Sequence, residues 1–175
     1  MPDASDLLTG LFYRAIDEVR APERLTATLP PPPKGRTLVL AAGKAAGSMA
    51  AIVESVRDGP LSGLAVTPPG YEMPLRRIES LTAGHPLPDE RSVAAASRFL
   101  SLARALTADD LALVLLSGGA SALLAAPAPG LTLEDKQRVT RALFAAGADI
   151  HEINAVRKHL SAIKGGRLAR AAVLA

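Results

Sequence analysis

A glycine- and serine-containing turn follows directly on an unbroken apolar run, a combination that suits an anion. The run is residues 111–116, LALVLL, and the turn is residues 117–121, SGGAS. Such a run is typical of a parallel strand buried on both faces, and the apolar stretch after the turn favours a helix start. A strand–turn–helix junction leaves backbone N–H groups free at the positive end of the helix dipole. The turn supplies glycines for close backbone approach and hydroxyl donors: Ser117, Gly118, Gly119 and Ser121. The alternative is an ordinary tight turn with helix-capping serines.

A second junction of the same kind carries a lysine. Residues 36–42, RTLVLAA, predict a buried strand, and residues 43–49, GKAAGSM, lead into a helix expected to end near Val56. Lys44, next to Gly43 in this turn, can supply a positive charge to a phosphate or carboxylate. No GxxxxGK[ST] or GxGxxG motif occurs in the chain, so neither nucleotide-binding fingerprint explains the turn. The alternative is a solvated surface lysine.

A third group of candidates lies in residues 154–167, NAVRKHLSAIKGGR. If the segment is helical, its apolar residues form one buried stripe and its polar residues share the other side. That polar side holds Asn154, Arg157, Lys158, Ser161 and Lys164. Such a cationic face can bind phosphate oxygens, and the alternative is a solvated basic surface.

The elements that must position these residues alternate between strand and helix patterns. Strands are expected at 36–42, 62–67, 78–83 and 111–116. Helices are expected at 3–20, from the turn at 43–49 to about residue 56, at 92–106 and at 132–146. Because no two-residue hairpin interrupts them, they predict βαβ units and a three-layer α/β/α, Rossmann-like domain with a mainly parallel sheet. We expect residues 111–116 to be its central strand. Residues 1–35 then form an N-terminal helix and a proline-rich connector, and residues 36–175 form the α/β domain.

His85 follows the third expected strand, at the edge of the sheet where ligands of open α/β folds bind. No second histidine or carboxylate stands at ligand spacing from it, so we expect no metal site in this chain. The loop at residues 84–88 contains two prolines and precedes a helix that we expect Asp89 or a neighbour to cap.

Composition excludes several classes of function. The chain has 175 residues, a formal charge of +3, three Phe, two Tyr and no Trp, which disfavours base stacking and nucleic-acid binding. It has no cysteine, which excludes disulfides, thiolate catalysis and zinc–cysteine sites. No apolar run reaches membrane-spanning length and the first residues lack a signal-peptide pattern, so we expect a cytoplasmic protein with no membrane partner.

Four stretches, in order along the chain, resemble the glycerate 2-kinase family. They are AAGKAAGSMA at residues 41–50, AGHPLPDE at 83–90, SGGASALL at 117–124, and the long stretch at 131–169. These are two-domain kinases whose second part is called the MOFRL domain, and some members carry the older label hydroxypyruvate reductase. Two departures stand out: Ala120 occupies a position that is usually glycine, and residues 68–70, PPG, replace a more polar loop.

The resemblance implies a kinase that transfers the γ-phosphoryl group of ATP to an alcohol group, the 2-hydroxyl of D-glycerate, giving 2-phosphoglycerate. It implies ATP and Mg²⁺ as cofactors, small-molecule and nucleotide partners, and Lys44 as the catalytic cation. The turns at residues 43 and 117–121 and the cations Arg157, Lys158 and Lys164 are the implied phosphate- and substrate-binding groups. No carboxylate pair for Mg²⁺ and no base for the hydroxyl are evident in the sequence.

The family's chains are roughly twice this length or more, so we expect an N-terminal piece that lacks the MOFRL domain. We expect this piece to be inactive alone and to self-associate as a homo-oligomer through the apolar segment 168–175. Two alternatives remain open. One is an NAD(P)H-dependent hydroxypyruvate reductase, which the missing GxGxxG motif disfavours. The other is a non-catalytic, anion-binding fragment.

Overall fold

A computed structural model describes residues 3–20 and 22–173 and divides the chain into two compact units, residues 1–31 and 32–175. The first unit contains α1 (Ala4–Arg20), the expected N-terminal helix, and α2 (Pro22–Thr28). α2 was not predicted, because the expected helix ended at residue 20 and the residues after it were assigned to the connector. Pro22 is instead the first residue of α2, a position where proline is tolerated because its missing N–H has no helical partner.

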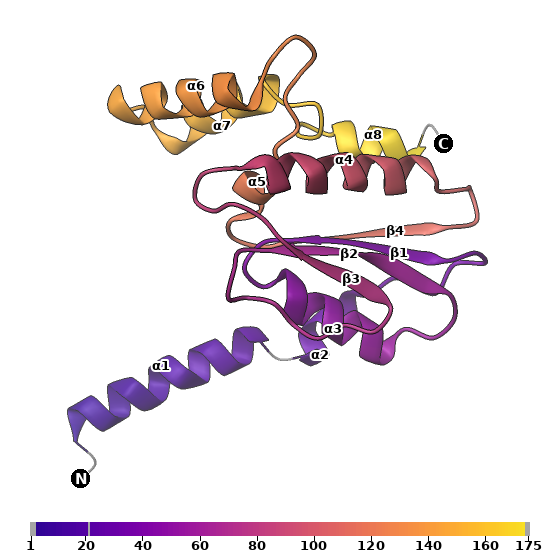
Figure 1. Cartoon of the computed structure of the whole chain (residues 1–175). Helices are drawn as coiled ribbons and strands as arrows, with labels where there is room; N and C mark the ends of the chain where they lie inside the picture. The colour runs from indigo at the N-terminus through magenta and orange to yellow at the C-terminus, as the bar shows by residue number, and fades with distance from the viewer. Residues whose placement is uncertain (1–2, 21, 174–175) are drawn as a thin grey trace. The chain divides into compact units, whose positions relative to one another are not determined.

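The second unit is built on a four-stranded sheet in which every pairing is parallel (Figure 1). The strands lie in the order β3 (Ile78–Thr82), β2 (Leu61–Thr67), β1 (Thr37–Ala42), β4 (Leu111–Leu116). One face is covered by α3 (Ala46–Val56), and the other by α4 (Glu90–Arg104), α5 (Ala120–Leu123) and α8 (Arg167–Val173). This arrangement confirms the predicted three-layer fold with a parallel sheet.

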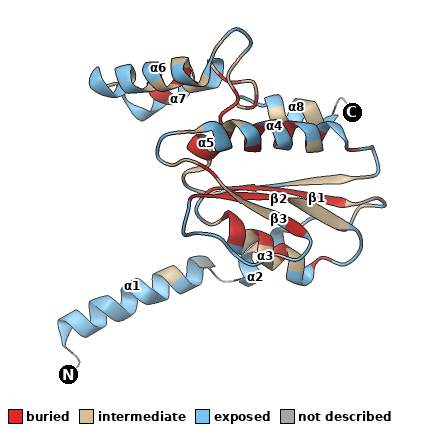
Figure 2. Cartoon of the chain, in the orientation of Figure 1, coloured by how far each residue is buried: buried red, intermediate tan, exposed pale blue. Residues whose placement is uncertain are grey.

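The predicted position of β4 is wrong: it is an edge strand, and β1 and β2 are central. Every residue of β1 is buried, whereas Val114 and Leu116 of β4 are 43% and 61% exposed (Figure 2). An apolar run indicates that both faces of a strand are covered by other parts of the protein. It does not indicate whether a neighbouring strand is hydrogen-bonded along each of its two edges. β1 and β4 have equally apolar sequences, so the run could not distinguish the central strand from the edge strand.

The remaining helices are α6 (Leu133–Ala145) and α7 (Ile150–His159). A capping box starts α6: the Thr132 side chain accepts a hydrogen bond from the Asp135 amide, and the Asp135 side chain accepts one from the Thr132 amide. The conditional single helix over residues 154–167 is wrong beyond His159, because the chain turns there and pairs with residues 126–128: the Ala162 amide donates to the Ala126 carbonyl, and the Ala128 amide donates to the Leu160 carbonyl. Ser161, expected beside the cations, is fully buried in this turn, where its hydroxyl accepts from the amides of Ile163 and Lys164.

Candidate functional site

The two glycine-containing turns meet at the C-terminal ends of β1 and β4. The parallel register pairs Ala42 with Leu116, so both strands end at the same level. The Lys44 amide donates to the Gly118 carbonyl at 2.9 Å, and the Ala45 amide donates to the Ser117 hydroxyl at 2.9 Å. The structure therefore brings the predicted residues of both turns together.

The same contacts reduce the number of backbone donors below what the sequence predicted. The amides of Lys44 and Ala45 are used within the protein. Among the described residues, the second turn holds three amides that donate to no protein group, those of Gly118, Gly119 and Ser121. α5 has only four residues, so its dipole adds little to the turn. What the junction offers an anion is mainly these three amides, the Lys44 ammonium group and the serine hydroxyls.

Gly43 makes the close approach of the two turns possible. Its φ is +126°, and a Cβ at this position would lie 2.2 Å from Ser117 Oγ and 2.6 Å from the Ser117 carbonyl oxygen. Only glycine tolerates both this backbone conformation and this distance. Contact with the other turn therefore requires glycine at position 43, directly before the candidate catalytic residue Lys44.

His85 lies against the second turn, a position that the sequence analysis left as a loop residue. A Cβ on Gly119 would lie 3.0 Å from His85 Cδ2 and Nε2 and 3.8 Å from Lys44 Cγ. Gly119 has a φ of +92°, so a larger residue there would be both strained and crowded. The sequence analysis placed His85 at this edge of the sheet from its position after β3, but its contact with Gly119 was not predicted.

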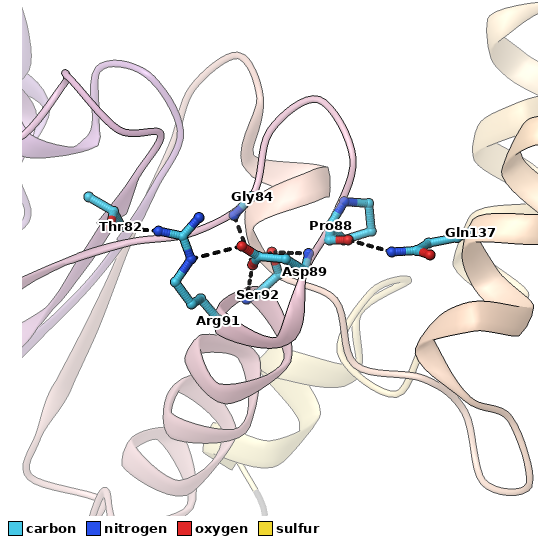
Figure 3. A network of polar contacts seen from close by, with 7 residues as sticks. All are labelled: Thr82, Gly84, Pro88, Asp89, Arg91, Ser92 and Gln137. Atoms are coloured by element: carbon cyan, nitrogen blue, oxygen red, sulfur yellow. Dashed lines mark hydrogen bonds and ion pairs between the residues drawn. The ribbon is translucent and has the colours of Figure 1, made fainter.

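Asp89 holds the His85 loop to the start of α4 (Figure 3). Its carboxylate accepts hydrogen bonds from the amides of Gly84 and Ser92, both at 3.0 Å, and from Arg91 Nε at 2.8 Å. Burial alone would raise the pKa of Asp89, but the hydrogen bonds from Arg91, Gly84 and Ser92 lower it to about 2. Gln137 of α6 donates to the Pro88 carbonyl at 2.8 Å, which ties α6 to the same loop.

We expect Asp89→Ala to lower the free energy of unfolding by about 1–2 kcal/mol, the usual effect of losing a helix N-cap. The Asp89 contribution is complete above its unfolded pKa of 3.8 and is lost as pH falls towards its folded pKa of about 2. Urea unfolding at pH 6 and at pH 2.5 measures both effects. Equal stability differences between wild type and variant at the two pH values would contradict this assignment.

A cluster of three cations lies beside the second turn and comprises Lys136, Arg157 and Lys164. Lys164 Nζ donates to the carbonyls of Ser121 (3.1 Å) and Leu124 (2.9 Å). Lys136 Nζ donates to the carbonyl of Leu160 at 2.8 Å. Burial, together with the charge of Arg157, lowers the pKa of each lysine to about 8, and burial also lowers the pKa of Arg157.

The structure thus places two of the three predicted cations, Arg157 and Lys164, in one cluster. Lys158 is exposed on α7 and lines a neighbouring groove. The sequence analysis missed Lys136. The sequence pattern could have identified it. Lys136 occupies a position on the inward-facing side of α6, between Leu133 and Leu143, where an apolar residue is expected.

The lowered lysine pKa values predict that stability rises with pH. Between about 8 and the ordinary value of 10.5, the folded chain has released protons that the unfolded chain still binds, so the free energy of unfolding increases. Denaturant unfolding between pH 7 and 9.5 should show this rise, and Lys136→Met should reduce its slope. A slope that is the same in both proteins would contradict the prediction.

The cation cluster opens onto a groove of about 810 Å³. Its walls are mostly apolar and come from β4, α4 and α8, including Val114, Ala103 and Leu168. Its polar end is formed by Ser117, Ser121, Asn154, Arg157, Lys158 and Lys164. Lys44 does not line this groove; Ser117 connects the two regions, because it lines the groove and accepts from the Ala45 amide.

The groups around the turns suit phosphate better than a metal ion. Within residues 3–20 and 22–173, no group of three or more histidine or acidic side chains is placed to hold a metal. The groups at the turns and in the cluster are ammonium, guanidinium, hydroxyl and imidazole, whereas Mg²⁺ prefers carboxylate and phosphate oxygens. These residues therefore do not fit Mg²⁺. No helix in the same residues is both long and apolar enough to cross a membrane.

Comparison with known proteins shows similarity to glycerate kinases. The chain is 47% identical over 137 residues to "Glycerate 2-kinase" of Pyrococcus horikoshii, covering 78% of this chain and 31% of that protein. It is 47% identical over 171 residues to a protein of Agrobacterium vitis named "Putative hydroxypyruvate reductase", covering 97% of this chain and 39% of that protein. The crystal structure of glycerate kinase from Thermotoga maritima superposes with a TM-score of 0.80 at 36% identity, covering 95% of this chain and 42% of that chain.

The chain thus spans less than half of the length of these relatives. The family model described as Domain of unknown function (DUF4147) matches residues 7–175, which include both turns, the His85 loop and the cation cluster. On this match, which runs over nearly the whole sequence, the chain belongs to the DUF4147 family.

Proposed function

We propose that this chain is part of a glycerate 2-kinase, which transfers the γ-phosphoryl group of ATP to the 2-hydroxyl of D-glycerate. The observation that carries the proposal is the meeting of the turns of β1 and β4, with Lys44 in one and three unpaired amides in the other. Phosphoryl transfer depends mainly on positioning and charge stabilisation, and these groups supply both. Relatives named glycerate kinase support the choice of reaction.

In this proposal Lys44 is the catalytic cation, which stabilises the charge of the transferring phosphoryl group. The amides of Gly118 and Gly119 and the hydroxyls of Ser117 and Ser121 bind phosphate or carboxylate oxygens. Arg157, Lys158 and Lys164 add positive charge at the polar end of the groove. Gly43 allows the two turns to approach.

The reaction requires groups beyond those described. ATP is the phosphoryl donor, and the Mg²⁺ that accompanies it in kinases would need oxygen ligands that these residues do not supply. We propose that residues 36–175 form one domain of a two-domain kinase, which the 31–42% coverage of longer relatives supports. On this proposal the 175-residue chain alone has no kinase activity and self-associates in solution.

A hydroxypyruvate reductase is the second candidate, and the name of the Agrobacterium vitis relative favours it. The turn after β1 argues against it, because residues 43–49 lack the GxGxxG pattern that lets a backbone approach a dinucleotide pyrophosphate. A longer protein containing this sequence can be assayed with D-glycerate, ATP and Mg²⁺, and separately with hydroxypyruvate and NAD(P)H. Phosphoryl transfer supports the kinase, and NAD(P)H oxidation without phosphoryl transfer would replace it with the reductase.

A further inference from the structure

The cation cluster contains three positive charges and no compensating carboxylate. In the described part of the chain, none of Lys136, Arg157 and Lys164 has an acidic oxygen within ion-pair distance. The two lysines donate to backbone carbonyls, whereas Arg157 makes no hydrogen bond to any described residue. A half-buried guanidinium group thus keeps its donors unused beside two other cations.

This arrangement is unfavourable for the isolated chain. Like charges that are partly removed from water repel one another, and burial disfavours their charged forms. Burial lowers the pKa values of the two lysines, and the neighbouring positive charges lower them further. A bound anion would relieve the repulsion, and a dianion would do so more completely than a monoanion. The planar fork of Arg157 is suited to two oxygens of one phosphate group.

The space around the cluster defines where such a group would sit. The cavity among Lys136, Arg157 and Lys164 has about 10 Å³, room for no more than a water molecule. Ser121, Arg157 and Lys164 line both this cavity and the 810 Å³ groove. A phosphate group therefore reaches the cluster from the groove, and Lys136 lies on the closed side, bonded to the Leu160 carbonyl.

We propose that Arg157, Lys164 and Ser121 form a binding site for the phosphate group of a small molecule, with Lys136 reinforcing its positive charge from behind. The site is separate from the Lys44 turn, because Lys44 lines neither cavity. This inference rests on the proposed function, in which Ser121, Arg157 and Lys164 already contribute to anion binding, and it commits their site to a phosphate group. Its test measures binding alone, so its failure can be told apart from a failure of the proposed reaction, which the product assay tests.

The test measures binding of inorganic phosphate to the purified chain at pH 7 by calorimetry and by thermal unfolding, at constant ionic strength. We expect saturable binding that raises the unfolding temperature. Acetate at the same ionic strength should have at most a small effect. Stronger stabilisation by acetate would make this a carboxylate site, and an unsaturable response to both ions would reduce it to general screening; either result overturns the proposal.

Variants identify the site. Arg157→Gln should weaken phosphate binding at least tenfold, whereas Arg157→Lys, which keeps the charge but not the fork, should retain part of it. The matched control is Arg141→Gln, which removes the same charge from an exposed position on α6 and should change binding less than twofold. Wild-type affinity in Arg157→Gln would overturn the proposal.

A second readout separates binding from a structural role. Without phosphate, Arg157→Gln should be at least as stable as wild type, because it removes an unpaired charge from a repulsive cluster. With saturating phosphate, wild type should become the more stable protein. If Arg157→Gln is less stable than wild type in both conditions, the guanidinium group supports the fold and the proposal is wrong.

Discussion

Replacing Gly43 with alanine should destabilise the chain by about 3 kcal/mol, through backbone strain and a steric clash together. The φ of +126° is unfavourable for alanine, and the new Cβ would lie 2.6 Å from the Ser117 carbonyl oxygen, a backbone atom that cannot rotate away. The turns must separate to relieve this clash. Because Lys44 is the next residue, the same change should abolish most of the kinase activity that we propose for a longer protein containing this sequence. Denaturant unfolding and a turnover assay measure the two effects.

Substitutions at two other glycines distinguish the effect of backbone strain from the effect of the steric clash. Gly118→Ala lies in the partner turn, in open space and at an ordinary φ, and should change stability by no more than about 0.5 kcal/mol. Gly70→Ala has a φ of +84° in open space, so it carries the strain without the clash. If Gly43→Ala is no more destabilising than Gly70→Ala, the close packing of the two turns does not contribute to stability.

Lys44→Ala in the longer protein should reduce turnover at least tenfold, equivalent to about 1.4 kcal/mol in the activation barrier. Lys44 is exposed and has no ion-pair partner in the described chain, so its loss should leave stability nearly unchanged. Lys34→Ala removes the same charge from an exposed position outside the turns and is the matched control. Wild-type turnover in Lys44→Ala would reduce Lys44 to a surface residue.

The layer architecture could be predicted because it depends on local patterns. The alternation of apolar strands with amphipathic helices, and caps such as Thr132 and Asp89, act over a few residues. The order of strands depends instead on which edges pair, a property that residues 111–116 do not encode locally. The break after His159 was missed for a related reason: it depends on hydrogen bonds between residues 160–162 and residues 126–128, which are tertiary contacts.

The meeting of the two turns could be predicted from the rule that parallel strands end at one edge of the sheet. The contacts that reduce the number of free hydrogen-bond donors at the site could not be predicted. Nothing in the sequence shows that the Ser117 hydroxyl accepts from the Ala45 amide, or that His85 lies against Gly119. Lys136 joins Arg157 and Lys164 only because α6 and α7 pack together, which depends on the fold rather than on the spacing of the cations.

The most direct test of the account is the position of the phosphate in the reaction product. The longer protein should be incubated with D-glycerate, ATP and Mg²⁺, and the product analysed by phosphorus–proton correlation NMR. We predict a phosphorus signal coupled to the single proton on carbon 2, which identifies 2-phosphoglycerate, and its loss in Lys44→Ala. Coupling to the two protons on carbon 3, or unchanged D-glycerate, would contradict the proposed glycerate 2-kinase.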